Sequence, residues 1–163
     1  ETLPRVQAER PQARLMIVGA DPPPAVRKLG ELPGVTVTGS VPDVRPYILR
    51  SCAMVAPLNI ARGTQNKILE AMAMGVPVVT STAGAGGVDA EDEAHFLVAG
   101  TPADCARQAL RLMDDAGERA RLASAGRARM LSHHDWAASM RRLDTIVERC
   151  LDSCAQRSMR AAQ

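Results

Sequence analysis

The chain has 163 residues, enough for one compact domain with a substantial core. Its 20 Lys and Arg nearly balance 18 Asp and Glu, and the formal net charge of +2 excludes the strongly basic surface typical of nucleic-acid-binding proteins. Phe, Tyr and Trp occur once each, which argues against an RNA-binding platform of exposed aromatics and leaves Val, Leu, Ile, Met and Ala to build the core.

The four cysteines predict neither a disulfide framework nor a metal site, because they contain no CxxC pair: Cys52, Cys105, Cys150 and Cys154. Cys150 and Cys154 lie one helical turn apart, but no His or third Cys stands at a spacing that would complete a zinc site. No apolar run approaches the ~20 residues that span a bilayer. We therefore expect a soluble, cytoplasmic protein without a metal, and leave open peripheral contact with the inner face of the membrane.

The chain opens with residues 1–13, which are typical of the end of a helix that leads into a strand. We expect from this that an upstream strand, and with it an upstream domain, is missing. Short apolar runs rich in β-branched residues then predict strands at 14–19, 34–39, 52–58, 77–81 and 95–100. Most of these runs are continuous, as in strands that are buried on both faces.

Helical patterns follow the strands, at 24–32, at 41–52 with Asp43 as the N-cap and Pro46 in the first turn, and at 64–75. The alternation of strand and helix predicts a doubly wound, parallel α/β sheet with right-handed crossovers. We interpret residues 1–163 as a single domain.

Residues 101–160 are predicted to be mainly helical. The candidate cap is Thr101 or Asp104, and breaks are expected near Gly117 and Ser132. The Arg-rich stretch at 119–130 is interpreted as a solvated helix face, with contact to anionic lipid as the alternative.

The segment PLNIARGT, residues 57–64, leaves the third predicted strand and enters the next helix. Ligands of open α/β sheets bind at this edge, where helix N-termini carry free N–H groups. Gly63 allows close approach of the backbone to a ligand, and Thr64 is expected to cap the helix. Lys67 would then lie in the first turn, which is favourable when an anion such as a diphosphate binds the same helix end.

Gly63, Lys67, Glu70 and Met74 follow three- and four-residue steps and should share one face of this helix. The apolar residues between and after them should point into the core: Ile68, Leu69 and Met72. A carboxylate one turn beyond a phosphate-facing lysine suits the vicinal hydroxyls of a ribose. Spacing alone leaves open a solvated Lys67–Glu70 ion pair worth a few tenths of a kcal/mol.

The segment GTQNKILEAMAMGVPVVTS at 63–81, with VTVTGSVPDVRPYILRSCAMVAPL at 35–58 before it, resembles the C-terminal domain of retaining glycosyltransferases of group 1 (family 4). That family uses nucleotide-sugar donors and has two Rossmann-like domains, the GT-B architecture. The resemblance covers about residues 1–150, and its most specific element is KxxEAMAxGxPVV. It is closest to bacterial exopolysaccharide transferases associated with exosortase protein sorting.

The resemblance implies that Glu70 holds the donor ribose, that Lys67 contacts phosphate, and that backbone groups at the end of the second strand receive the base. The implied donor site, without metal or cofactor, comprises Gly39, Ser40, Val41, Arg62, Gly63, Thr64, Asn66, Lys67 and Glu70. Many members carry a further glutamate that would fall on Arg62 here. Arg62 is expected either to pair with a phosphate or charged sugar, or to mark an altered site.

The implied function is transfer of a sugar from a nucleoside-diphosphate sugar to a sugar or lipid-linked acceptor, with this chain alone inactive. The alternatives are a non-hydrolysing sugar-nucleotide epimerase and a degenerate domain with an assembly or regulatory role.

One further segment is ambiguous. The glycine-rich residues 82–92 are predicted to be either a flexible linker or a loop that closes over the donor sugar.

Overall fold

The computed structural model describes residues 1–161, with side chains described for residues 1–153 except at position 138. Five strands form two sheets in which every pair is parallel. One sheet pairs β1 (Leu15–Val18) with β2 (Val35–Gly39). The other has the order β3-β4-β5, made of Met54–Ala56, Val78–Thr80 and Leu97–Val98. The predicted parallel α/β class is confirmed, and each strand lies within its predicted range.

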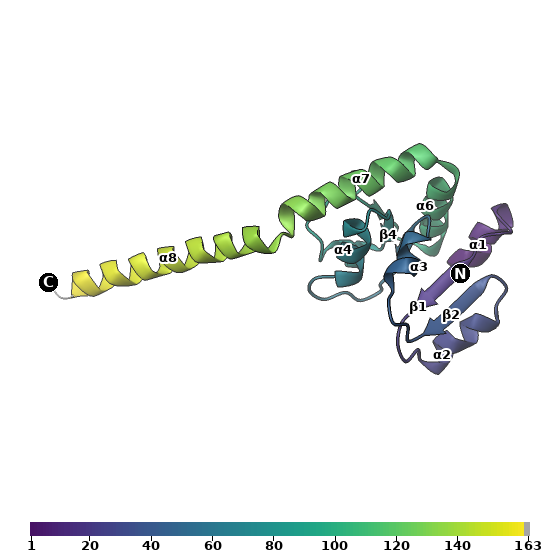
Figure 1. The fold of residues 1–163 in the computed structure, drawn as a ribbon, viewed down its shortest axis with the longest axis horizontal. Helices are drawn as coiled ribbons and strands as arrows, with labels where there is room; N and C mark the ends of the chain where they lie inside the picture. The colour runs from purple at the N-terminus through teal and green to yellow at the C-terminus, as the bar shows by residue number, and fades with distance from the viewer. Residues whose placement is uncertain (162–163) are drawn as a thin grey trace.

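Helices connect and cover these strands (Figure 1). In chain order they are α1 (Thr2–Glu9), α2 (Pro24–Arg27), the 3-10 helix η1 (Lys28–Glu31), α3 (Arg45–Leu49), α4 (Asn66–Ala73), α5 (Thr82–Ala85), α6 (Pro102–Asp114), α7 (Ala116–His133) and α8 (Trp136–Ala161). The helix expected at the start of the chain is therefore present as α1.

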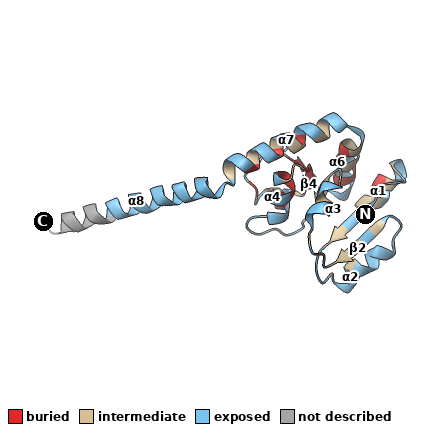
Figure 2. Cartoon of the chain, in the orientation of Figure 1, coloured by how far each residue is buried: buried red, intermediate tan, exposed pale blue. Residues whose placement is uncertain are grey.

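The core lies mainly around β4, whose three residues are all buried (Figure 2). On one side α4 contributes Ile68 and Met72, which pack with Val78 and Phe96 in one buried cluster. A second cluster joins β4 and β5 to α6 and α7 through four buried apolar residues: Val79, Leu97, Leu112 and Leu122. β4 is therefore the central, fully buried strand of the larger sheet, and its position fixes the chain that follows its carboxyl end.

The β1–β2 sheet is attached to the rest through α1. Val6 of α1 and Ala13 form a buried cluster with Ala106 of α6. The strands of this smaller sheet are less covered, and Met16 in β1 is 39% exposed. The expectation of strands buried on both faces therefore holds for β4, which packs with α4 in one buried cluster and with α6 and α7 in the other, but not for β1.

Two predicted helix starts need correction or refinement. The N-cap of α3 is Val44, and Asp43 lies one residue earlier, where its carboxylate accepts the N–H of Arg45 at 2.9 Å. At α6 the cap is Thr101, whose hydroxyl accepts the N–H of Asp104 at 3.1 Å. Asp104 is thus the capped residue rather than the cap.

The breaks in the C-terminal helical region lie close to their predicted places. Asp115 ends α6 and caps α7 by accepting the N–H of Glu118 at 2.9 Å, two residues before the predicted break at Gly117. The second break follows His133, one residue after Ser132.

Beyond this break α8 extends away from the body of the molecule (Figure 1), and its described side chains are exposed (Figure 2). No helix in the described chain is long and apolar enough to cross a membrane. Among the described residues no three metal-ligating side chains lie together. Cys150 and Cys154, which are one helical turn apart in the sequence, are not compared in the structure, because the side chain of Cys154 lies outside the described residues.

Candidate functional site at the carboxyl ends of the strands

The carboxyl ends of β1 and β2 are held together at Gly39. The N–H of Gly19, directly after β1, donates to the carbonyl oxygen of Gly39 at 3.3 Å. Gly39 has φ +71°, a conformation that side chains disfavour, so the chain turns sharply into Ser40 and Val41. The first part of the predicted site therefore lies at the strand edge, as expected.

The second part is the turn between β3 and α4, where the predicted cap is wrong. Thr64 does not cap the helix; α4 begins at Asn66, and Gln65 is its N-cap residue. The side chain of Gln65 bends back, and its Nε2 donates to the carbonyl oxygens of Arg62 at 3.2 Å and Gly63 at 3.1 Å. The N-cap of α4 is therefore one residue later in the chain than the predicted cap, Thr64. Gly63 provides the required positive φ of +63°.

The backbone N–H groups of residues 62–67 form an unbroken run of free donors. Within the described part of the chain no acceptor lies against any of them. Successive outward N–H groups next to a left-handed residue, at the start of a helix, are a general arrangement for binding anions. The turn thus offers an anion both backbone donors and the positive end of α4.

Lys67 and Glu70 are exposed on α4, while Ile68 and Met72 are buried at 0% and 1% exposure. This confirms the predicted division of the helix into a solvent face and a core face. Leu69 is partly buried against the same core. Among the described residues neither Lys67 nor Glu70 has a side-chain hydrogen bond or ion pair, so the solvated pair that spacing left open is not formed. Both charges are available to a ligand.

Arg62, where the resemblance predicts a further glutamate, is also exposed. Its side chain has no hydrogen bond or ion pair with the described residues. Two unpaired cations, Arg62 and Lys67, therefore stand at the two ends of the run of free N–H groups. The arrangement is suited to a dianion.

The base of this turn is fixed to the end of β4 by two hydroxyls. Thr80 Oγ1 donates to the carbonyl oxygen of Ala56 at 3.1 Å, and Ser81 Oγ donates to that of Leu58 at 2.6 Å. Ser81 also caps α5, accepting the N–H of Gly84 at 3.1 Å. Ser81 is not among the predicted site residues, although a serine directly after a strand and before a helix is a recognisable cap signal.

The glycine-rich segment 82–92 is packed rather than a free linker. It begins as α5, and Val88 is only 7% exposed. Asp89 is bound by Arg129 of α7, which donates to its carbonyl oxygen at 2.8 Å and to its carboxylate at 2.7 Å. The hydrogen bond from Arg129 holds the pKa of the Asp89 carboxyl below its usual value. Gly87 lies directly against the carbonyl oxygen of Gly63.

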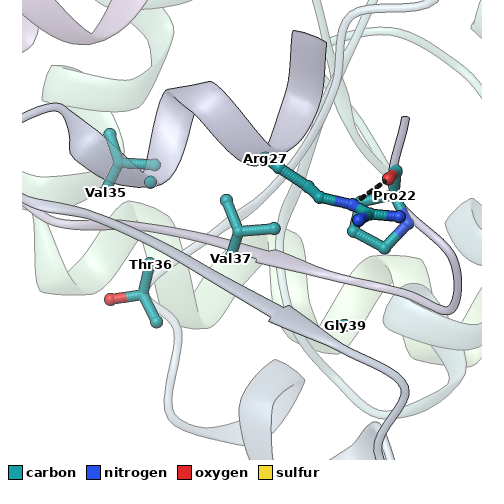
Figure 3. A pocket seen from close by; sticks show the side chains of 7 residues that line it. Pro22, Arg27, Val35, Thr36, Val37 and Gly39 are labelled. Carbon is teal, nitrogen blue, oxygen red and sulfur yellow. Dashed lines mark hydrogen bonds between the residues drawn. The ribbon is translucent and has the colours of Figure 1, made fainter. Parts of the chain in front are cut away.

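A separate hollow of about 630 Å³ lies beside β2 (Figure 3). Its lining includes Val35 and Val37 on the strand and Arg27 of α2, whose Nε donates to the carbonyl oxygen of Pro22 at 2.8 Å. Of the predicted site residues only Gly39 reaches it. The hollow is therefore a neighbour of the candidate site rather than the site itself.

The structure brings the exposed residues of the stretch 62–70 together on the turn and the first turns of α4, whereas residues 39–41 lie at the end of a strand of the other sheet and in the loop after it. Ser40 and Val41 follow Gly39 in the loop before α3. The roles that the resemblance assigns to these residues remain predictions.

Residues 1–115 match the family model described as glycosyl transferases group 1. A mannosyltransferase of Corynebacterium glutamicum, described as GDP-mannose-dependent and acting on a monoacylated phosphatidylinositol monomannoside, is 27% identical over 161 residues. That alignment covers 91% of this chain and 42% of the relative. The chain thus spans about two fifths of the curated relative it matches.

Two solved structures have the same fold. HepE of Anabaena in complex with UDP is 18% identical with a TM-score of 0.77, covering 90% of this chain and 44% of that one. The C-terminal domain of LpcC, a group 1 glycosyl transferase family protein of Francisella tularensis, is 14% identical with a TM-score of 0.61, covering 83% of this chain and 94% of that domain. The chain belongs to the group 1 glycosyltransferases and has the fold of their C-terminal GT-B half.

Proposed function

We propose that this chain is the donor-binding half of a retaining glycosyltransferase and holds a nucleoside-diphosphate sugar at the turn between β3 and α4. The observation that carries the proposal is the run of free N–H groups at residues 62–67, flanked by the unpaired cations Arg62 and Lys67. A diphosphate satisfies those donors, and the unpaired carboxylate of Glu70 is then one turn away for the ribose hydroxyls.

In the proposed reaction the acceptor hydroxyl attacks the anomeric carbon, and the nucleoside diphosphate leaves. Negative charge grows on the leaving diphosphate, and the backbone donors and Lys67 stabilise it where it develops. Gly39, Ser40 and Val41 are proposed to receive the base. The acceptor, whether a sugar or a lipid-linked one, would be bound by a further domain, since the chain spans only 42% of its relative.

The proposal has three finer parts. The association with exopolysaccharide synthesis and exosortase sorting rests on the resemblance. The cytoplasmic location, with contact at the inner membrane face, rests on the cysteine pattern and the Arg-rich stretch at 119–130. The third part is donor binding without a metal ion. The last is directly testable, because nucleotide affinity should be the same in EDTA as in Mg²⁺.

The test of the donor site is a titration of the 163-residue chain with UDP, GDP and ADP, followed by calorimetry and backbone NMR shifts. UDP and GDP are chosen because one similar structure holds UDP and one relative is GDP-mannose-dependent. We expect shifts at residues 39–41 and 62–70. Glu70→Gln should weaken binding about tenfold or more, the scale of a charge-assisted hydrogen bond.

Glu148→Gln is the matched control, because Glu148 is exposed on α8, away from the turn. It should leave the affinity unchanged. Equal affinities of the wild type and Glu70→Gln for a nucleotide that binds would contradict the ribose role of Glu70. Absence of shifts at 62–67 with a nucleotide bound elsewhere would contradict the site as a whole.

The degenerate-domain alternative is favoured by one observation, Arg62 in place of a glutamate. It predicts that no nucleotide binds. Arg62→Glu replaces the arginine by the residue that is common in the family. On a working donor site, this variant loses a phosphate-facing cation and should bind pyrophosphate more weakly than the wild type. On a degenerate domain, neither the wild type nor the variant should bind.

A further inference from the structure

We propose that Gly87 and Gln65 are positioning residues that aim the backbone donors of the Gly63 turn at the ligand. The inference rests on the proposed donor site and explains how its geometry is maintained. The carbonyl groups of Arg62 and Gly63 both have a hydrogen-bond partner within the chain.

Both carbonyl oxygens accept a hydrogen bond from the same side chain. Gln65 Nε2 donates to the oxygen of Arg62 at 3.2 Å and to that of Gly63 at 3.1 Å. In a planar trans peptide the C=O and the next N–H point in opposite directions. Fixing these two oxygens therefore turns the N–H groups of Gly63 and Thr64 to the other side, where no acceptor of the described chain meets them.

Gly87 allows the oxygen of Gly63 to lie where it does. A Cβ placed on Gly87 would overlap that oxygen, would come within 3.3 Å of the carbonyl carbon of Gly63 and would lie 3.5 Å from the Cγ of Gln65. The absence of a side chain at this position is thus a condition for the observed orientation of the Gly63 peptide.

The segment that carries Gly87 is itself held in place. Val88 is buried in the core, and Asp89 is bound by Arg129 through two hydrogen bonds of 2.7 and 2.8 Å. A methyl group at position 87 would therefore be carried by a fixed segment and would press on the exposed Gly63 turn. We expect the Gly63 turn to be the part that moves.

The chain provides a matched control in the adjacent residue. A Cβ on Gly86 would be 3.7 Å from its nearest neighbour atom, the oxygen of Ala83, which is ordinary van der Waals contact. Gly86→Ala and Gly87→Ala therefore make the same chemical change in the same segment. They differ in whether the added methyl group meets the Gly63 carbonyl.

The experiment compares the wild-type chain with Gly87→Ala, Gly86→Ala and Gln65→Met by amide NMR and by titration with inorganic pyrophosphate, UDP and GDP. Gly87→Ala and Gln65→Met should both shift the amide resonances of Gly63 and Thr64 and weaken pyrophosphate and nucleotide binding about tenfold, the scale of a lost charge-assisted hydrogen bond. Gly86→Ala should do neither. The thermal midpoints show whether each variant is folded.

Equal amide shifts and affinities in Gly86→Ala and Gly87→Ala would overturn the inference, as would unchanged Gly63 and Thr64 resonances in Gln65→Met. Failure of the donor-site proposal would give a different result from failure of this inference. The wild type would then bind neither pyrophosphate nor nucleotide, while the shifts of the free chain would still report whether Gly87 and Gln65 position the turn.

Discussion

Gly84 occupies a position in α5 where any side chain would collide with a buried hydroxyl. A Cβ there would overlap Thr80 Oγ1, which is 1% exposed as a residue and donates to the carbonyl oxygen of Ala56 at 3.1 Å. Rotation of Thr80 would relieve the overlap only by breaking this buried hydrogen bond, and χ1 of a β-branched residue is stiff. The site is intolerant of even one carbon atom.

We therefore expect Gly84→Ala to lower the free energy of unfolding by about 1–3 kcal/mol, the usual range for overpacking. Urea denaturation followed by circular dichroism measures the change. Gly100→Ala is the comparison, because a Cβ at Gly100 would meet its nearest neighbour at 3.8 Å. Equal losses in the two variants would contradict the Thr80 contact as the cause, because helix propensity and chain entropy by themselves favour Ala over Gly in the folded chain.

At the same scale, some site residues were predictable and others were not. Lys67 and Glu70 were assigned to the exposed face of α4 because helical spacing separates them from the apolar positions 68 and 72. Thr64 was wrongly assigned as a cap, because its residue type is suited to that role while the actual turn is closed by Gln65. Gly87 was not identified, since the need for a glycine there comes from a contact 24 residues away in the sequence.

At the scale of elements, an ion-pair network joins α6, α7 and the turn before β5. Arg111 contacts Glu93 at 2.8 Å, and Glu118 accepts from Arg121 at 2.7 Å and from Arg111. The Glu118 side chain is only 12% exposed. The hydrogen bond from Arg121, with Arg111 nearby, holds the pKa of Glu118 below its usual value.

Because the folded pKa of Glu118 is lowered, its contribution to stability is complete above the unfolded glutamate pKa of about 4.3 and is lost as the pH falls through the folded pKa. Glu118→Gln should lower the free energy of unfolding at neutral pH by about 0.5–1 kcal/mol and have no effect below both pKa values. Urea unfolding across this pH range tests the sign. Glu31→Gln is the control, since Glu31 forms no ion pair with the described residues; an equal pH dependence of the two variants would contradict the role of Glu118.

Element prediction succeeded where the pattern is local. Continuous apolar runs located all five strands, and the 3.6-residue pattern located α4, because periodicity reports which face is buried. Segment 82–92 remained ambiguous, since glycine serves equally in a free linker and in close packing. The structure resolves it through two residues that hold this segment: Ser81 accepts the N–H of Gly84 at the start of α5, and Arg129 of α7 donates to Asp89.

On the scale of the whole molecule, the two sheets are joined through the packing of α1 on α6 rather than through a strand ladder. Sequence patterns indicate strands but not which of them pair, so division into two sheets was not predictable. The exposure of α8 was not predictable either. Its apolar residues follow helical spacing and would suit a buried face equally well: Trp136, Met140, Leu143 and Val147.

Trp136 makes the state of α8 directly measurable, because it is the only tryptophan of the chain and is 78% exposed. We expect its fluorescence emission to be that of indole in water and acrylamide to quench it nearly as efficiently as free tryptophan. Both properties should be constant over a dilution series, as for a helix that stays surrounded by solvent. Blue-shifted emission that dilution reverses would instead show that the apolar face of α8 packs on a second copy, and Leu143→Glu should then abolish the shift, because burying an unpaired carboxylate in such a contact is costly.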